Sequence, residues 1–136
     1  MTNRILFSAL IFFCLSCSKS EGEGGTSSIR GKVYAKIYNK NITAVNAEGY
    51  APEEDVYIIY GDQVTYSDNQ NTNYDGYYEF KYLRPGNYKV YAYSRDSTGA
   101  YKYNVNTNAP AVAVIAEVKI STNYETVVVP DISIIK

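Results

Sequence analysis

The sequence predicts an all-β protein, folded as one antiparallel β-sandwich of about seven short strands. Three observations support this fold class. Apolar and polar residues alternate with a period of two in several segments, as in half-buried strands. Turn-forming residues separate these segments, and no segment shows a convincing amphipathic helical pattern. The chain is also rich in strand-forming side chains, with 16 Tyr among its 136 residues.

The first strand is expected over Ile29–Tyr38, because its side chains alternate along the whole segment. One predicted face carries Ile29, Gly31, Val33, Ala35 and Ile37, and the other carries Lys32, Tyr34, Lys36 and Tyr38. A more buried strand is expected over Val56–Tyr60. Short strands are expected at Ile42–Val45 and Val64–Ser67, and the polar stretch Asp68–Asn73 is expected to be a connection.

Two turns frame the next predicted strand. Asp75 and Gly76 suit a turn that needs positive φ. The strand follows over Tyr77–Tyr82, with Tyr78, Phe80 and Tyr82 on one face. Leu83-Arg84-Pro85-Gly86 is expected to lead the chain into the next turn, with Pro85 at the second turn position and Gly86 at the third. Alternation resumes over Tyr88–Tyr93.

Two further strands are expected near the C-terminus. Val112–Ile120 is predicted to be a long strand, and its Val and Ile content favours this over the alternative of a helix at Ala109–Glu117. Thr126–Ile135 is predicted to be the last strand. Pro130 lacks the amide that a central ladder needs, so it is expected at an edge or a bulge.

The N-terminus predicts a lipid anchor. Ile5–Leu15 is apolar except for Ser8, and its eleven residues are too few to span a bilayer, which needs about 20. Leu15-Ser16-Cys17 resembles the lipobox of bacterial lipoproteins, which implies cleavage before Cys17 and lipidation of its sulfur. We therefore expect a signal peptide at 1–16, a lipidated Cys and flexible tether at 17–28, and one β-sandwich domain at 29–136.

The residues after Cys17 suggest where the protein is sorted. Ser18–Gly25 resembles the acidic surface-export signal of bacteroidete-type lipoproteins. This resemblance implies an outer-membrane protein that is held by its lipid and faces the cell exterior. The alternative is that these Ser, Gly and Glu residues only form a soluble tether, which leaves the inner face of the outer membrane open.

The middle of the chain resembles carboxypeptidase regulatory-like domains, which have a transthyretin-like (prealbumin-like), immunoglobulin-like sandwich. The motifs that carry the resemblance are Gly31-Lys32-Val33, Asp75-Gly76-Tyr77-Tyr78-Glu79-Phe80 and Leu83-Arg84-Pro85-Gly86-Asn87-Tyr88. The resemblance implies that Tyr88 forms a tyrosine corner with nearby backbone. It also implies a non-enzymatic binding or accessory module. The same strands weakly resemble the repeats of Gram-positive adhesin stalks, so a structural or assembly subunit is the alternative.

Composition excludes several classes of function. The 13 basic and 14 acidic residues are balanced and scattered, so no nucleic-acid partner is expected. The chain has no His, and lipidation would occupy Cys17, so the usual general base and thiol nucleophile are absent. No enzyme activity, cofactor or metal is expected.

Asn71–Gly76 mimics the start of a calcium loop, but Tyr82 stands where that loop needs Glu. Glu53-Glu54-Asp55 leaves a carboxylate-dependent hydrolase as the least favoured alternative.

Tyrosines are the remaining candidate ligand-binding groups. We expect Tyr34 and Tyr38 on the outer face of the first strand, and Tyr91 and Tyr93 on the outer face of a later one. Such rings could bind a glycan, a peptide or an envelope protein; alternatively, they only cover the sheet. Asp96-Ser97-Thr98 resembles a bacteroidete O-glycosylation site, which implies modification of Ser97.

Overall fold

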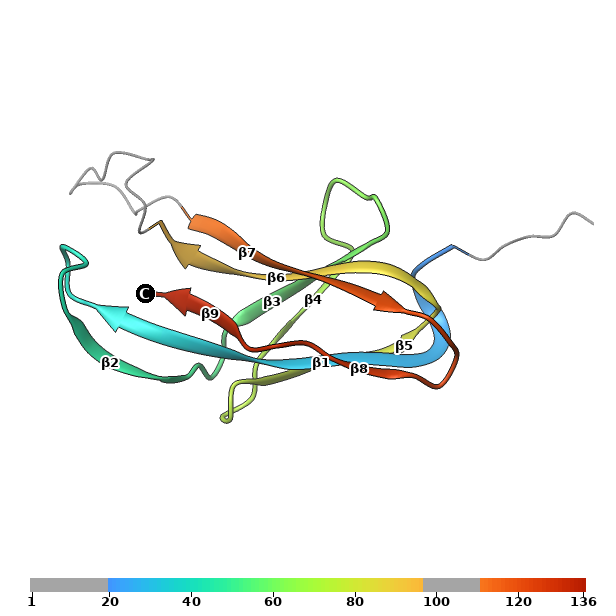
Figure 1. Ribbon diagram of the computed structural model, residues 1–136, viewed down its shortest axis with the longest axis horizontal. Coiled ribbons are helices and arrows are strands. Elements are labelled where there is room, and N and C mark those ends of the chain that lie inside the picture. The colour runs from blue at the N-terminus through green and yellow to red at the C-terminus, as the bar shows by residue number, and fades with distance from the viewer. Residues whose placement is uncertain (1–19, 97–110) are drawn as a thin grey trace, which may run out of the picture.

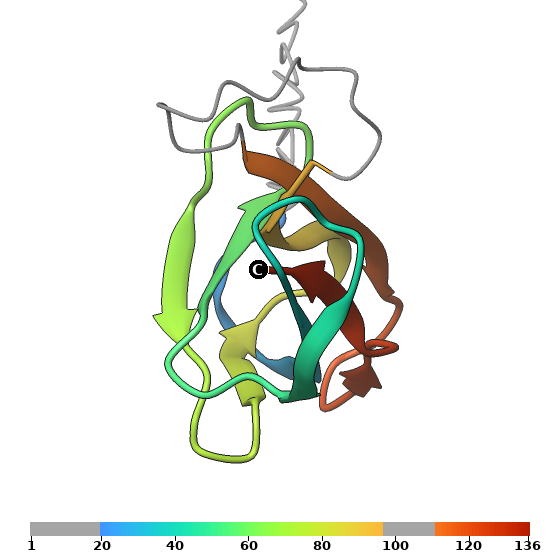
Figure 2. The ribbon, with the colours of Figure 1, turned by 90° about the vertical axis from the view of Figure 1, so that its left-hand side faces the viewer.

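The protein is a two-layered β-sandwich (Figures 1 and 2). The computed structural model describes residues 20–96 and 111–136, and every regular element in these ranges is a strand. Within the same ranges, no helix is long and apolar enough to cross a membrane. The prediction of an all-β sandwich is confirmed, although the described ranges hold nine strands rather than about seven.

One layer is a five-stranded sheet built around a long central strand, β1 (Glu23–Tyr38). Along one edge of β1 lie two antiparallel partners, β5 (Tyr77–Leu83) and β2 (Val45–Tyr50). Along the other edge lie two parallel partners, β8 (Thr126–Val128) and β9 (Ile132–Ile135). Along the first edge, the partner of β1 changes from β5 to β2 at Val33. The Val33 amide donates to the Gly76 carbonyl, and the Val33 carbonyl accepts from the Ala51 amide.

The other layer is a four-stranded antiparallel sheet in the order β4-β3-β6-β7. Its inner strands are β3 (Asp55–Tyr60) and β6 (Gly86–Arg95), and its edges are β4 (Asp68–Asn71) and β7 (Ala111–Ile120). The connection over residues 61–67, between β3 and β4, rises above this layer in Figure 1. β7 pairs with β6 along its whole length.

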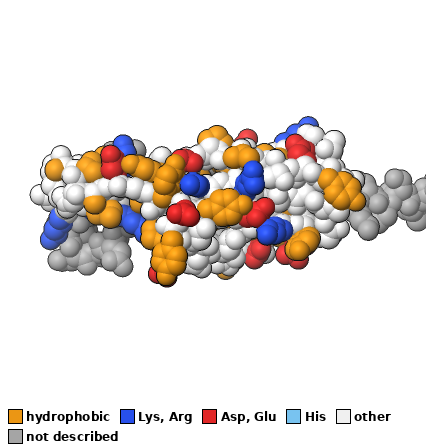
Figure 3. Space-filling view, turned by 90° about the horizontal axis from the view of Figure 1, so that it is seen from below, with side chains coloured by type: hydrophobic (Ala, Val, Ile, Leu, Met, Phe, Trp, Pro, Cys, Tyr) orange, Lys and Arg blue, Asp and Glu red, His pale blue; other side chains and the backbone are white. Residues whose placement is uncertain are grey.

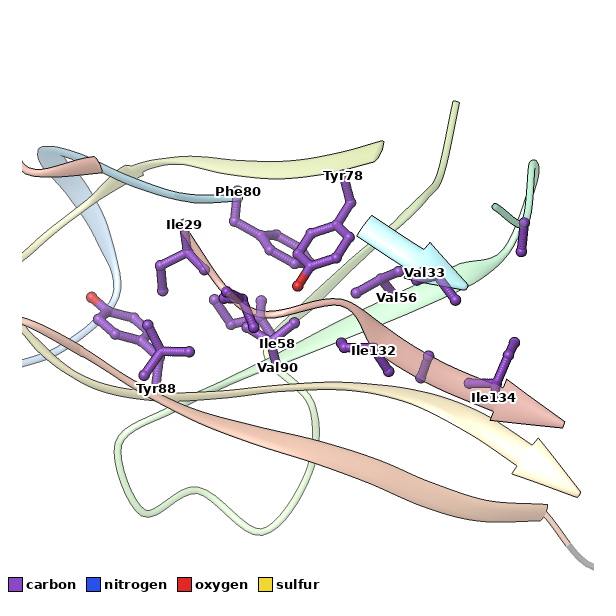
Figure 4. Close-up of a cluster of buried hydrophobic side chains, with 14 of the residues drawn as sticks. Ile29, Val33, Val56, Ile58, Tyr78, Phe80, Tyr88, Val90, Ile132 and Ile134 are labelled. Carbon is purple, nitrogen blue, oxygen red and sulfur yellow. The ribbon is translucent and has the colours of Figure 1, made fainter. Parts of the chain in front are cut away.

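The core lies between the two layers and follows from the alternation in the sequence. Ile29, Val33 and Ala35 of β1 are buried, and Val56, Ile58 and Val90 face them from the other sheet (Figure 4). Figure 4 also shows the rings of Tyr78 and Phe80 lying together inside the sandwich. Ile132 and Ile134 complete the core from the last strand.

Four predicted elements differ from the strands observed. β1 starts at Glu23 instead of Ile29, so residues 23–28 belong to the sheet and not to the tether. The expected strand at Thr126–Ile135 is two strands, because Pro130 interrupts it, and both run parallel to β1. The short strands expected at Ile42–Val45 and Val64–Ser67 are wrong: the strands there are β2 and the polar β4. Backbone pairing with a neighbouring strand, β1 for β2 and β3 for β4, outweighs local composition at both places.

The predicted face of β5 is wrong at Tyr82. Tyr78 and Phe80 are buried, but Tyr82 has a φ of 59° and is exposed, and Leu83 takes the next buried position. The register between β1 and β5 is irregular at the same end, as in a β-bulge. At the other end of β5, Gly76 has a φ of 70°, and a Cβ there would lie 2.8 Å from the Val33 carbonyl oxygen. The Asp75-Gly76 turn therefore requires glycine for two reasons.

Candidate tyrosine binding surface

Four tyrosine rings form one contiguous group on the outer face of the four-stranded sheet. We call Tyr57, Tyr66, Tyr91 and Tyr93 the tyrosine cluster. The rings of Tyr57 and Tyr91 stack at 16° with their centroids 5.1 Å apart. Tyr66 and Tyr93 lie edge-on to Tyr57, at 5.1 and 5.5 Å, and Tyr93 also lies edge-on to Tyr91 at 5.5 Å. Stacked and T-shaped pairs at these distances are the favoured aromatic geometries.

Strand alternation and the β3–β6 register place three of the four rings, Tyr57, Tyr91 and Tyr93. In β3 and β6, Val56, Ile58 and Val90 point into the core, so their neighbours point outwards. Tyr57 and Tyr91 are directly opposite in the β3–β6 register. Tyr93 is two residues beyond Tyr91, on the same face. The sheet therefore brings together rings that are far apart in the chain.

A loop supplies the fourth ring. Tyr66 precedes Ser67, whose amide donates to the Ile58 carbonyl at 2.7 Å. The Ser67 hydroxyl accepts from the Tyr60 amide at 3.0 Å and donates to the Gln63 side-chain oxygen at 2.7 Å. These bonds fasten the end of the connection to β3, and they hold Tyr66 over Tyr57.

The cluster is partly packed and partly open. Tyr91 is buried, Tyr57 is half-buried, and Tyr66 and Tyr93 are 53% and 44% exposed. Burial, together with a hydrogen bond to Tyr93, raises the pKa of Tyr91 to about 12. Burial and the nearby Asp55 carboxylate raise the pKa of Tyr57. The Tyr57 and Tyr91 hydroxyls therefore stay protonated at neutral pH and can both donate and accept hydrogen bonds.

Polar groups and one apolar side chain border the cluster. Asn69 of β4 stands opposite Tyr57, and Ile115 of β7 stands opposite Tyr91. Asp55 and Asn71 are paired across β3 and β4, and the Asn71 amide donates to the Asp55 carboxylate at 3.1 Å. The surface thus combines ring area with amide and hydroxyl groups, the mixture that orients a ligand in a binding site.

The structure does not bring the four predicted binding tyrosines together. Tyr91 and Tyr93 belong to the cluster, but Tyr34 and Tyr38 lie on β1, on the outer face of the opposite sheet. Tyr34 packs edge-on against Tyr50 at 5.5 Å. The four rings therefore do not form one surface, because β1 and β6 belong to different layers.

The outer face of the five-stranded sheet has a different chemistry. The Lys32 ammonium lies 4.4 Å from the centre of the Tyr50 ring, and the Tyr50 hydroxyl donates to Asp131 at 3.1 Å. This side is seen in Figure 3, where charged side chains of both signs separate the apolar ones. The exposed Tyr50 ring thus already has charged neighbours of both signs, as on an ordinary solvated surface.

The turn residues act as structural elements. The Tyr88 hydroxyl donates to the Arg84 carbonyl at 2.6 Å and accepts from the Gly22 amide at 3.0 Å. It thereby ties the Pro85-Gly86 turn to the start of the folded chain. Two further predicted sites, Cys17 for lipidation and Ser97 for O-glycosylation, lie outside the described residues.

The acidic run before β3 is used in local contacts. The Glu54 carboxylate forms an ion pair with the Lys136 ammonium, and Asp55 accepts from Asn71. Glu53 has a φ of 54° and an exposed side chain. These three carboxylates do not face one another across a cleft in the way that a two-carboxylate hydrolase requires.

Sequence reasoning missed half of the cluster. Tyr57 could have been found, because it alternates with Val56 and Ile58 in a segment that was correctly predicted as a strand. Tyr66 could not, because its position depends on the hydrogen bonds of Ser67 and not on any periodic pattern.

Comparison with known proteins gives a structural likeness and no family. No protein-family model and no curated protein matches the chain. Among solved structures, the chain is similar to a crystal structure from Pseudomonas aeruginosa that is described as a "putative carbohydrate binding protein". The two are 12% identical, the match covers 80% of this chain and 90% of that chain, and the TM-score is 0.46.

Proposed function

We propose that this protein is a membrane-tethered, non-enzymatic binding module whose tyrosine cluster binds a neutral glycan. The observation that carries the proposal is the contiguity of four rings on a sheet face, two of them about half exposed. A packed cluster is already ordered before a ligand arrives, which lowers the entropy cost of binding.

The chemistry of the surface favours a glycan over other ligands. Tyrosine rings offer apolar area for the C–H faces of a sugar, and their hydroxyls offer both donors and acceptors for sugar hydroxyls. The bordering Asn69 and Asn71 amides are neutral, and the Asp55 carboxylate is already engaged by Asn71. A strongly charged peptide or a phosphate group would find no complementary charge in the cluster itself.

The proposed anchor places this surface close to a membrane. We propose that Cys17 is lipidated, that the chain is an outer-membrane lipoprotein facing the cell exterior, and that its fold is of the carboxypeptidase regulatory-like type. Arg84 donates from its guanidinium to the Ser20 carbonyl at 2.8 Å, so the described fold is already held at residue 20. Only Ser18 and Lys19 would then separate it from Cys17, which limits the span to about 10 Å.

Tyrosine fluorescence tests the proposal directly, because the chain has 16 Tyr and no Trp. The detergent-solubilised full chain would be titrated with a panel of neutral oligosaccharides. We expect at least one to change the emission, and we expect Tyr66→Ala and Tyr93→Ala each to weaken its binding about tenfold, about 1.4 kcal/mol.

The matched control is Tyr74→Ala, since Tyr74 is 91% exposed on the turn before β5 and outside the cluster. Its binding should equal that of the unchanged protein. Binding of unstructured peptides with no binding of any sugar would contradict the glycan assignment. Equal losses in Tyr74→Ala and Tyr93→Ala would contradict the assignment of the surface.

A further inference from the structure

Strand β7 forms a long, unprotected edge of the four-stranded sheet. It pairs with β6 on one side only, and no backbone hydrogen bond to its other side is present among the described residues. The opposite edge of the same sheet, β4, has four residues, all polar. β7 has ten residues, of which the first six, Ala111–Ala116, are uncharged and contain no Pro.

Such an edge is a template for another strand. Natural sheets usually guard their edges with charges, Pro, bulges or short strands. In β7, the charges are confined to Glu117 and Lys119, near its end. Its exposed apolar side chains are Ile115, which is 54% exposed, and Val112. Tyr57, Tyr91 and Ile115 lie opposite one another on neighbouring strands and form a row across the outer face, and the exposed Ile115 is the last residue of this row.

We propose that β7 pairs with β7 of a second copy of this chain, antiparallel and about a two-fold axis at Ile115. The two four-stranded sheets then join into one continuous sheet. Main-chain hydrogen bonds supply the association, as in other cases of strand addition. A symmetric pair with the same strand on both sides is the commonest way in which a protein forms a closed assembly.

The charges of β7 and the side of the sheet on which each side chain lies favour the register with its axis at Ile115. Residues directly opposite in an antiparallel pair share a face, so Ile115 must meet an outward residue of the second copy. An axis at Glu117 or Lys119 would place like charges opposite each other. The axis at Ile115 instead sets Glu117 against Ala113 and Lys119 against Ala111, and it lets the two Ile115 side chains cover each other.

A two-fold axis at a β7 residue whose side chain points towards the core gives a less favourable pairing. An axis at Ala116 would set Ile115 against a charged Glu117. An axis at Val114 would set Ile115 against Ala113 and shorten the ladder to residues 111–117. The Ile115 axis pairs residues 111–119, and it continues the outward row of one copy into that of the other.

The pairing has a consequence for binding. A two-fold axis perpendicular to the sheet keeps both outer faces on the same side, so the two tyrosine clusters would face the same way. A ligand with repeated units could then contact both copies, which increases avidity without new contacts. The pairing itself does not depend on the proposed ligand, because it depends only on the β7 edge.

Cysteine crosslinking of the full chain in its membrane tests the pairing. Ile115→Cys places two thiols at the axis, and we expect a short bismaleimide to give a covalent dimer of twice the chain mass. Val64→Cys is the matched control, because Val64 is 98% exposed in the connection between β3 and β4. The unchanged chain controls for its own two cysteines.

The register is tested by a second experiment that does not alter Ile115. Ala113→Cys and Glu117→Cys chains, carrying different tags and expressed together, should crosslink to each other more than either does to itself. The pairing is overturned if Ile115→Cys gives no more dimer than Val64→Cys, or if its main product has the mass of a different protein. The Ile115 axis is overturned if the Ala113 and Glu117 chains show no preference for each other.

Discussion

At the residue scale, Tyr88 connects three parts of the chain through one hydroxyl. The hydroxyl accepts from Gly22 and donates to Arg84, while the ring is buried next to Tyr60, with centroids 5.8 Å apart. Burial raises the pKa of Tyr88, so this hydroxyl remains protonated. The sequence motif Pro85-Gly86-Asn87-Tyr88 suggested the bond to the turn but not the bond to Gly22.

Tyr88→Phe tests the value of these two bonds. The substitution keeps the ring but leaves the Gly22 amide without this acceptor, so we expect a loss of about 1–3 kcal/mol in the free energy of unfolding. Urea denaturation measures it. Tyr74→Phe removes a hydroxyl from an exposed ring and should change stability by less than about 0.5 kcal/mol. Equal effects of the two substitutions would show that the corner contributes nothing.

Alkaline pH tests the burial of the tyrosines. Burial raises the pKa of both Tyr60 and Tyr91 to about 12, above the usual value near 10. The unfolded chain therefore loses these protons at lower pH than the folded one. The contribution of these two tyrosines to stability should be constant below pH of about 10, and stability should fall as pH rises from there towards about 12.

Phenolate absorbance measures this titration. The folded protein should show a delayed group of tyrosines that disappears in urea, and Tyr91→Phe should make that group smaller. Tyr74→Phe, a change outside the cluster, should leave the size of that group unchanged. A folded chain whose tyrosines all titrate like those of the unfolded chain would contradict the packed cluster.

At the scale of elements, close contact between β1 and β5 depends on Gly31. A Cβ at Gly31 would lie 2.5 Å from the Tyr78 hydroxyl oxygen, and that ring is buried. Gly49 of β2 offers a matched control, because no atom lies within 4 Å of its added Cβ. Both glycines are in strands of the same sheet.

We expect Gly31→Ala to destabilise the protein by about 1–3 kcal/mol through overpacking, and Gly49→Ala to be neutral or slightly stabilising. Thermal and urea unfolding of both variants measure the difference. Adding Tyr78→Phe to Gly31→Ala should recover part of the loss, because it removes the nearest atom. A neutral Gly31→Ala would contradict the close approach.

Elements with regular alternation were predictable, and irregular ones were not. The strands at Val56–Tyr60 and Val112–Ile120 match β3 and β7 within a residue, because local pattern and tertiary pairing agree there. Tyr82 was misplaced because a positive φ reverses the alternation at the end of β5. The polar β4 was missed because it gains its strand conformation from pairing with β3 and not from apolar side chains.

At the scale of the whole molecule, the sandwich decides which tyrosines can act together. Alternation showed correctly that several tyrosines point outwards, but only the assignment of strands to layers shows which rings share a face. Tyr34 with Tyr50 and the tyrosine cluster lie on opposite sides. Sheet order depends on contacts between distant segments, which the sequence pattern does not contain.

The proposed anchor predicts how the whole molecule is held. Cys17→Ser should release the protein from the membrane fraction and remove the lipid mass from its N-terminal peptide. Cys14→Ser changes the only other cysteine, which lies within the expected signal, and should leave the protein membrane-bound and lipidated. Retention of Cys17→Ser in washed membranes would contradict the anchor. Proteolysis of intact cells, with a periplasmic protein as control, tests whether the domain faces outwards.

Nitration of tyrosines by tetranitromethane, mapped by peptide mass spectrometry with and without a bound oligosaccharide, tests the binding surface most directly. Tyr66 and Tyr93 are exposed in the cluster, whereas Tyr74, Tyr82 and Tyr124 are exposed elsewhere. We predict that the ligand protects Tyr66 and Tyr93 and leaves the other three unchanged. Protection confined to Tyr74, Tyr82 or Tyr124, with Tyr66 and Tyr93 still fully nitrated, would contradict the assignment of binding to the tyrosine cluster.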